Sequence, residues 1–303
     1  MIVTRAFLTS VTLLLAATVV LAQSRKVNDN MIVTTDWLAK HLNDDTLVLL
    51  HVGVKEEYEA AHIPRAQFIQ IADISTPRGQ GLTLELPPVD QLKIAFEKFG
   101  VSENSRIVIY FSKDQLTPTA RVFMTLDYLG FGDRTSILDG GLPDWRAEGK
   151  PVTNEIVAAK KGMLTPHPNN NLIVDATWVK ENLNKSNVRI LDARAPQFYT
   201  GAEQGRMPRA GHIPSARSIP FSSLVEDTNN KFKSATALRA LFDQADVKPK
   251  STVATYCHIG QQASLLYFVA RYLGYEAHVY DGSFEDWSNR AELPVEKSVE
   301  AKP

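Results

Sequence analysis

Short apolar runs alternate with amphipathic stretches along most of this chain. These runs are either apolar throughout, as in residues 47–50, or rich in β-branched residues, as in residues 251–256, and both patterns are typical of buried strands. The stretches between them are long enough for helices and carry apolar residues on one face or, as in residues 265–274, on most sides. Because strands that alternate with helices pair in parallel and are covered on both faces, this pattern predicts an α/β fold with parallel sheets flanked by helices.

The second half of the chain repeats the first half in the same order. Each half contains a tryptophan-bearing helix, an apolar strand, a His-Ile-Pro triplet, a second strand, a Tyr-Leu-Gly triplet and an Asp-Gly pair before another tryptophan. The two His-Ile-Pro triplets, at residues 62–64 and 212–214, lie 150 residues apart, far more than one solenoid repeat. We therefore predict two domains, over residues 30–150 and 172–295. A linker without a core-facing pattern is expected over residues 151–171.

The N-terminus has the pattern of a secretory signal peptide. Arg5 precedes an apolar stretch over residues 6–21, and Val20 and Ala22 occupy the positions where a signal peptidase requires small residues. We therefore predict that residues 1–22 are removed and that the protein is exported, to the periplasm if its source is a Gram-negative bacterium. The alternative is an uncleaved membrane anchor, because the apolar stretch approaches the length of a transmembrane helix.

Composition and charge narrow the choice of partners. Hydrophobic residues make up 44% of the chain and charged residues 22%, and the formal net charge is -1. Such a chain can form ordinary cores and has no overall field that would attract nucleic acid or an anionic membrane. After cleavage at residue 22 no remaining apolar run is long enough to span a bilayer, so we expect no stable membrane insertion.

The single cysteine, Cys257, is the strongest candidate for chemistry. It follows the strand-like run 251–256 and precedes a helix-like stretch that begins near Leu265. In an open α/β sheet the ligand site lies at the carboxyl ends of the strands, and the amides of a turn that leads into a helix favour an anion. Gly260 allows such a turn to wrap around the sulfur. We therefore predict a thiolate nucleophile held by residues 258–263, against the alternative of a small buried hydrophobe.

The corresponding segment of the first half contains no cysteine. It follows Tyr110, the counterpart of Tyr256, and is longer by two residues up to the Tyr-Leu-Gly triplet. Pro118 also lacks the backbone N–H that an anion site would use. We therefore expect that only the second domain is catalytic.

Taken together and in this order, these motifs resemble the rhodanese sulfurtransferases, in the tandem arrangement with an inactive N-terminal domain. The resemblance covers nearly all of residues 31–290 and is most specific at Asp192-Ala193-Arg194, at residues 211–216 and at the loop from Cys257 to Ala263. It implies ping-pong chemistry. Cys257 would take a sulfane sulfur from a small anionic donor, such as thiosulfate or 3-mercaptopyruvate, and pass the resulting persulfide sulfur to cyanide or a thiol. It also implies that no metal or organic cofactor is needed, and a protein acceptor is a further alternative.

The resemblance places the donor against the cysteine loop. The loop residues expected to bind it are His258, Ile259, Gly260, Gln261, Gln262 and Ala263. Arg194 either binds the donor as well or pairs with Asp192. Arg206, Arg209 and Arg217 are further candidates to hold the donor's charge, with solvated surface positions as the alternative.

Two features of this chain depart from the usual substrate signatures. Thiosulfate-type members carry Arg-Lys after the cysteine and mercaptopyruvate-type members Gly-Ser, whereas this chain has His258 and Ile259. An arginine that often follows the Asp-x-Arg segment falls on Phe198. We therefore expect weak capture of thiosulfate. Protonation of His258 is expected to restore part of the charge as the pH falls through the imidazole range.

Two other functions have to be weighed against sulfur transfer. The first is a non-enzymatic module that binds a partner or carries sulfur. A module that only binds a partner would not need a thiol at a helix N-terminus, so Cys257 argues against that form of the alternative. The second is a cysteine phosphatase, whose chemistry needs an arginine that closes the loop and clamps phosphate. Position 263 is alanine, so the sequence disfavours a phosphatase.

Overall fold

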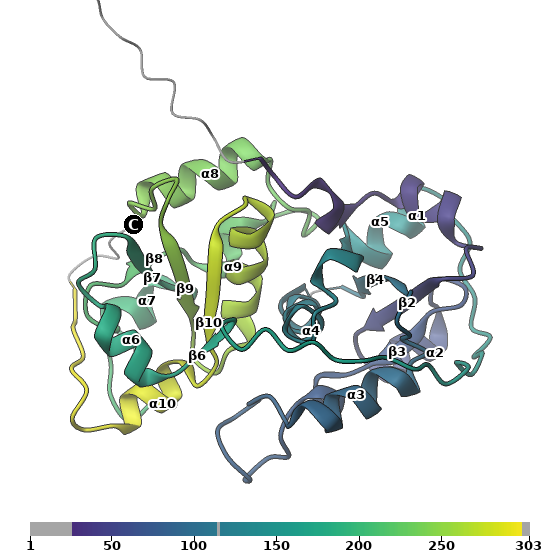
Figure 1. Ribbon diagram of the computed structural model, residues 1–303. Coiled ribbons are helices and arrows are strands. Elements are labelled where there is room, and N and C mark those ends of the chain that lie inside the picture. Colours follow the sequence, from purple (N-terminus) through teal and green to yellow (C-terminus); the bar gives the residue numbers. More distant parts are fainter. Residues whose placement is uncertain (1–25, 114–115, 299–303) are drawn as a thin grey trace, which may run out of the picture.

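Two sheets of five parallel strands form the framework of the molecule, one in each half of the chain (Figure 1). The strand order is β1-β5-β4-β2-β3 in the first sheet and β6-β10-β9-β7-β8 in the second. The two sheets therefore share one topology, as expected for a repeated domain. The predicted α/β fold with two parallel-sheet domains is confirmed.

The structure is a computed structural model and describes residues 26–113 and 116–298. The predicted signal peptide, residues 1–22, lies outside this part, and export stays a prediction. Within the described part, no helix combines the length and the apolar character needed to cross a bilayer.

The first domain carries helices on both faces of its sheet. Its strands are β1 (Ile32–Val33), β2 (Leu47–Val52), β3 (Gln67–Ile69), β4 (Arg106–Phe111) and β5 (Thr135–Leu138). Its helices are α1 (Thr35–His41), α2 (Lys55–Ala60), α3 (Val89–Lys98), α4 (Leu116–Tyr128) and α5 (Gly141–Ala147), with short 3-10 helices η1 (Asp29–Met31), η2 (Ile71–Ile74) and η3 (Gly132–Arg134). The central strand β4 is buried over nearly its whole length, which explains its uninterrupted apolar sequence.

The second domain repeats this arrangement. Its strands are β6 (Ile173–Val174), β7 (Val188–Asp192), β8 (Arg217–Ser218), β9 (Thr252–Tyr256) and β10 (Glu276–Tyr280). Its helices are α6 (Ala176–Asn182), α7 (Pro196–Thr200), α8 (Ala235–Gln244), α9 (Gln261–Tyr272) and α10 (Ser283–Asn289), with the 3-10 helix η4 (Phe221–Leu224). Here β9 is the central strand, and it leads directly to Cys257.

The two domains meet through α4 and α9, the helices that follow the two central strands (Figure 1). Both helices are buried on almost every side, because each packs against its own sheet and against the other helix. The rings of Phe123 and Phe268 meet edge to face there, with centroids 4.7 Å apart. A single apolar cluster therefore runs through both domains, while the outer face of each sheet has a smaller cluster of its own.

The segment between the domains packs against the first domain. Thr153 and His62 form an antiparallel bridge with two backbone hydrogen bonds of 2.8 Å. The N–H of Gly162 donates to the Glu97 carbonyl at 2.8 Å, and the Leu164 side chain is buried in the main cluster. A segment that buries only one leucine has no periodic pattern of apolar residues. This is why the sequence of residues 151–171 does not indicate that the segment packs against a core.

Candidate active site

Cys257 lies at the carboxyl end of β9, where the chain turns into α9. Its side chain is buried, with 1% of the residue exposed. Gly260 caps the helix in the left-handed region, with a φ of 86° that few residues other than glycine adopt. The predicted position of the thiol, at a strand end and before a helix N-terminus, is what the structure shows.

The loop after Cys257 wraps around the sulfur. The backbone N–H groups of Ala263, Ile259, Gln262 and Gly260 act on it so as to lower the pKa and favour the thiolate. Burial acts in the opposite direction and is the larger effect, so the pKa of the Cys257 thiol is raised above its usual range. The loop therefore forms the expected anion cradle, and the thiolate nucleophile stays a prediction, with its formation opposed by burial. The cost of desolvation depends on the packing around β9 and is not visible in the sequence.

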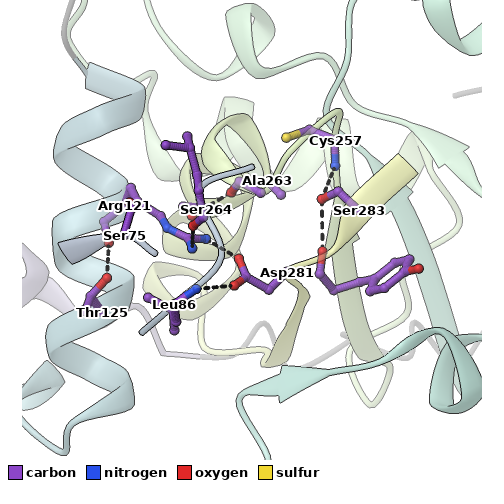
Figure 2. Close-up of polar contacts among 12 residues, drawn as sticks. Ser75, Leu86, Arg121, Thr125, Cys257, Ala263, Ser264, Asp281 and Ser283 are labelled. Carbon is purple, nitrogen blue, oxygen red and sulfur yellow. Dashed lines mark hydrogen bonds and ion pairs between the residues drawn. The ribbon is translucent and has the colours of Figure 1, made fainter. Parts of the chain in front are cut away.

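Ser283, at the start of α10, holds the backbone of the cysteine. The N–H of Cys257 donates to Ser283 Oγ at 3.2 Å, and the Ser283 hydroxyl donates to the Tyr280 carbonyl at 2.9 Å (Figure 2). The Cys257 carbonyl accepts a hydrogen bond from the Phe284 N–H at 3.0 Å. Sequence reasoning did not identify Ser283. The repeated Asp-Gly pair just before it was the only available signal.

Arg194 forms a buried ion pair with Asp192. Its Nη2 and Nε atoms donate to the Asp192 carboxylate at 2.7 and 3.0 Å, and Nη2 also donates to the Gly211 carbonyl at 2.7 Å. Its guanidinium lies 4.1 Å from the centroid of the Phe284 ring. Burial disfavours the charged guanidinium, but Asp192 outweighs it and raises the pKa of Arg194. Of the two predicted roles, the structure shows the pairing with Asp192, and direct contact with a donor stays a prediction.

His258 faces apolar surroundings beside the thiol. Its ring meets the ring of Phe198 edge to face, with centroids 4.6 Å apart. Burial lowers the pKa of His258 to about 4, and the positive charge of Arg194 acts in the same direction. The expectation that His258 gains a proton in the usual imidazole range is therefore wrong, because partial burial makes the charged imidazolium less favourable than in water.

A cavity of about 860 Å³ opens between the domains beside the cysteine loop. The second domain contributes residues from three segments, 198–208, 258–261 and 285–289, and the first domain contributes residues from segment 71–84. Of the loop residues expected to bind the donor, His258, Ile259 and Gln261 line this cavity. The Gln261 amide nitrogen donates to Thr117 Oγ1 of α4 at 3.2 Å, so the first domain holds this side chain.

Ala263 turns away from the cavity. It is fully buried at the start of α9, where its N–H serves the cysteine cradle and its carbonyl accepts from Thr255 Oγ1 at 3.0 Å. The loop therefore has two roles. Its backbone N–H groups surround the sulfur, and the side chains of His258, Ile259 and Gln261 form part of the cavity wall.

The three arginines near the Gly-His-Ile-Pro segment occupy different positions, and only one of them lines the cavity. Arg209 donates four hydrogen bonds of 2.7 to 2.9 Å to backbone carbonyls between residues 287 and 293, so it fixes the end of α10. Arg217 lies in β8 and is not part of the cavity wall, whereas Arg206 is. The wall also contains Arg78 of the first domain, which sequence reasoning missed because it lies far from every motif.

The first domain lacks the chemistry at the equivalent place. β4 continues into Phe111 where β9 gives way to Cys257, and Ser112 donates to the Glu57 carboxylate at 2.7 Å. His51 stands where the second domain has Asp192, and Gly53 where it has Arg194. His51 accepts or donates one hydrogen bond with the Tyr110 hydroxyl at 2.9 Å, and burial lowers its pKa to about 4.

A buried ion pair that joins the two domains lies close to Gly260 of the cysteine loop. Arg121 of α4 pairs with Asp281 at the end of β10, and its Nη2 donates to the Leu84 carbonyl at 2.6 Å (Figure 2). The Asp281 carboxylate also accepts from the Leu86 N–H at 3.1 Å. A Cβ atom at Gly260 would come within 2.7 Å of Asp281 Oδ1 and 2.9 Å of Arg121 Nη1. The close approach of this pair therefore requires glycine in the loop.

Comparison with known proteins identifies the family. The model of the rhodanese-like domain matches residues 34–148 and 175–290, so the chain belongs to this family.

In the described residues, no group of three or more His, Cys, Asp and Glu side chains is placed to hold a metal ion.

Three curated relatives align along nearly their whole length. The sulfur carrier protein TtuD of Thermus thermophilus is 31% identical over 287 residues, which cover 89% of this chain and 98% of the relative. The 3-mercaptopyruvate sulfurtransferase of Escherichia coli is 27% identical, with 87% and 97% covered. The thiosulfate sulfurtransferase of Azotobacter vinelandii is 27% identical, with 86% and 94% covered. The predicted enzyme class is confirmed: the chain is a sulfurtransferase.

A solved structure with the same fold is that of the anaerobic ergothioneine biosynthesis enzyme from Chlorobium limicola. It superposes with a TM-score of 0.79 at 21% identity, over 89% of this chain and 71% of that one. At this identity the likeness supports the fold.

Proposed function

We propose that the protein moves a sulfane sulfur from a donor such as thiosulfate or 3-mercaptopyruvate to cyanide or a thiol, through a persulfide on Cys257. The observation that carries the proposal is the set of four backbone N–H groups around the Cys257 sulfur at the end of β9. Donors of this kind fix the negative charge of an anionic sulfur without any side chain. The same groups serve the thiolate before the transfer and the persulfide after it.

With thiosulfate as donor, each half of the reaction exchanges one sulfur bond. The Cys257 thiolate attacks the outer sulfur, the new S–S bond forms, the S–S bond of thiosulfate breaks, and sulfite leaves with the bonding electron pair. In the second half, the acceptor attacks the outer sulfur of the persulfide and the Cys257 thiolate is the leaving group. The cradle favours the departure of the Cys257 thiolate, because its N–H groups stabilise the negative charge that returns to the sulfur.

A sulfur-carrier role is the second candidate, because the relative TtuD is named as a carrier protein. Both roles use the same persulfide and differ in the fate of its outer sulfur. A carrier keeps the sulfur until one protein partner arrives, whereas an enzyme turns over with small acceptors.

Intact-mass spectrometry of the full protein tests the proposal. After incubation with thiosulfate or 3-mercaptopyruvate we expect a gain of one sulfur atom, confined to the peptide that contains Cys257. Addition of cyanide is expected to remove that mass and release thiocyanate over many cycles. No mass gain with either donor contradicts the proposal, and a stable gain that cyanide cannot remove favours the carrier role.

The rate of persulfide formation is expected to rise with pH. Because burial raises the pKa of Cys257, the thiol is protonated at neutral pH, and its thiolate fraction grows about tenfold per pH unit below that pKa. His258, with a pKa of about 4, stays neutral in this range and adds no charge as the pH falls from 8 to 5. The measurement is single-turnover persulfide formation with thiosulfate, whose own charge is constant there. His258→Ala should show the same slope, and a rate that rises on acidification contradicts the assignment.

A further inference from the structure

The cavity beside the cysteine loop combines apolar walls with a cationic rim. Its apolar wall residues include Ile71, Leu84, Phe198, Met207, Pro208 and Ile259. Two exposed arginines, Arg78 of the first domain and Arg206 of the second, also line it, and neither forms an ion pair or hydrogen bond with another residue in the described part of the chain. The wall also holds an acidic side chain, Glu285, whose carboxylate oxygens accept from the N–H and hydroxyl of Thr83 at 2.8 and 2.9 Å.

We propose that this cavity binds an organic sulfur compound with an apolar body and a terminal anionic group, and that Arg78 of the inactive domain anchors the anion. The inference rests on the proposed function, since it names the class of thiol that receives the Cys257 sulfur. The apolar body lies on Phe198 and Ile259, beside the thiol, and the anionic end lies at the rim.

The size of the cavity favours an organic substrate. A volume of about 860 Å³ falls in the range of about 300–1,000 Å³ that is usual for sites of drug-sized ligands. A small inorganic anion fills little of it. Each methylene group that moves from water onto such a wall strengthens binding by about fourfold.

The distribution of charge points the same way. On the cavity wall beside the loop, the edge-to-face pair of Phe198 and His258 offers no cation to a small anion, and the charge of Arg194 is already paired with Asp192. An anionic group placed against these rings would lose its hydration without a partner. At the rim, the guanidinium groups of Arg78 and Arg206 can hold a carboxylate in charge-assisted hydrogen bonds. A substrate that spans both regions places its apolar body against Phe198 and its anionic group against the arginines.

Arg78 lies on a segment that is fastened to the second domain. Thr83 of this segment binds Glu285 of α10, the Leu84 carbonyl accepts from Arg121, and the Leu86 N–H donates to Asp281. The segment is closed on itself by a 2.8 Å hydrogen bond from the Thr76 N–H to the Glu85 carbonyl. The first domain thus supplies part of the substrate site, although it has no thiol of its own.

The chemical step is the second half of the proposed reaction. The acceptor thiolate attacks the outer sulfur of the Cys257 persulfide and a new S–S bond forms on the acceptor. The bond between Cys257 Sγ and the outer sulfur breaks, and Cys257 leaves as a thiolate. One thiolate is consumed and one is regenerated, so no oxidant or reductant is required.

A series of straight-chain ω-mercaptocarboxylates, from mercaptoacetate upward, tests the inference with the persulfide form of the full protein. We expect kcat/KM to rise by about fourfold per added methylene group until the chain fills the cavity. Neutral alkanethiols of the same lengths are the matched acceptors without the anion. Their kcat/KM should rise by the same factor per methylene group, but each value should be lower than that of the carboxylated thiol of the same length.

Arg78→Met keeps the length of the side chain and removes its charge. It is expected to lower kcat/KM by about tenfold for the carboxylated acceptors and to leave the neutral thiols and cyanide unchanged. The control is Arg146→Met, which changes another exposed arginine of the first domain that does not line the cavity. Phe198→Arg is expected to weaken the dependence on chain length and to improve kcat/KM for thiosulfate by about tenfold or more.

A flat response to chain length, or an Arg78→Met effect that is equal for carboxylated and neutral acceptors, overturns the inference while the proposed function stands. Failure of the parent protein to form a persulfide overturns the proposed function, and the inference falls with it. The two failures are distinguished by the intact mass of the protein before any acceptor is added.

Discussion

Cys257→Ser is expected to abolish sulfur transfer and to leave the fold intact. The serine oxygen cannot form a persulfide, whereas its size is close to that of the thiol and the loop N–H groups can bond to it. We expect turnover with thiosulfate and cyanide to fall below detection. The free energy of unfolding should change by about 1 kcal/mol or less, because the buried hydroxyl finds partners. The measurements are thiocyanate release and urea unfolding.

Cys257→Ala provides the second variant, since alanine can form neither a persulfide nor a hydrogen bond with the cradle. Loss of activity in both variants, with cooperative unfolding retained, assigns the chemistry to the sulfur. Turnover that persists in either variant shows that the thiol is not the carrier.

Arg121→Met is expected to lower the free energy of unfolding by about 3–5 kcal/mol. Methionine fills most of the space but leaves the buried Asp281 carboxylate without its cation and the Leu84 carbonyl without its donor. The residue that loses its charge is completely buried, with 0% exposed, so water cannot compensate. Equilibrium unfolding in urea measures the loss.

An exposed ion pair of the first domain is the control. Lys55 and Glu59 lie 3.3 Å apart on α2 with side chains 66% and 44% exposed, so Lys55→Met should cost about 0.5 kcal/mol or less. Arg121→Met combined with Asp281→Asn should cost less than Arg121→Met alone, because the unpaired charge is gone. If Arg121→Met costs no more than Lys55→Met, the buried pair does not stabilise the molecule.

The framework of the molecule could be predicted from local sequence patterns. The β-branched run before Cys257 becomes β9, and the apolar stretch after Gly260 becomes α9. The repeat led directly to two domains of one topology. These predictions succeed because strand and helix periodicity depend on neighbouring residues alone.

The properties of the site depend on residues that are distant in the chain. Arg78 and Arg206 line one cavity although 128 residues separate them, and no motif links the two. Arg121 sits in an apolar helix, where its charge gave no indication of a partner as remote as Asp281. The pKa of Cys257 and that of His258 both follow from burial, which depends on how segments distant in the chain pack around them.

The continuous apolar cluster across α4 and α9 limits how modular this chain can be. A duplicated gene could in principle discard the copy that has no thiol, or use the active copy as a separate unit. Here the catalytic helix α9 is covered on its outer side by α4, so a severed second domain would expose a large apolar face to solvent. The minimal catalytic unit is therefore the pair of domains. The first domain can do without a cysteine, but it cannot do without the helix that shields its partner.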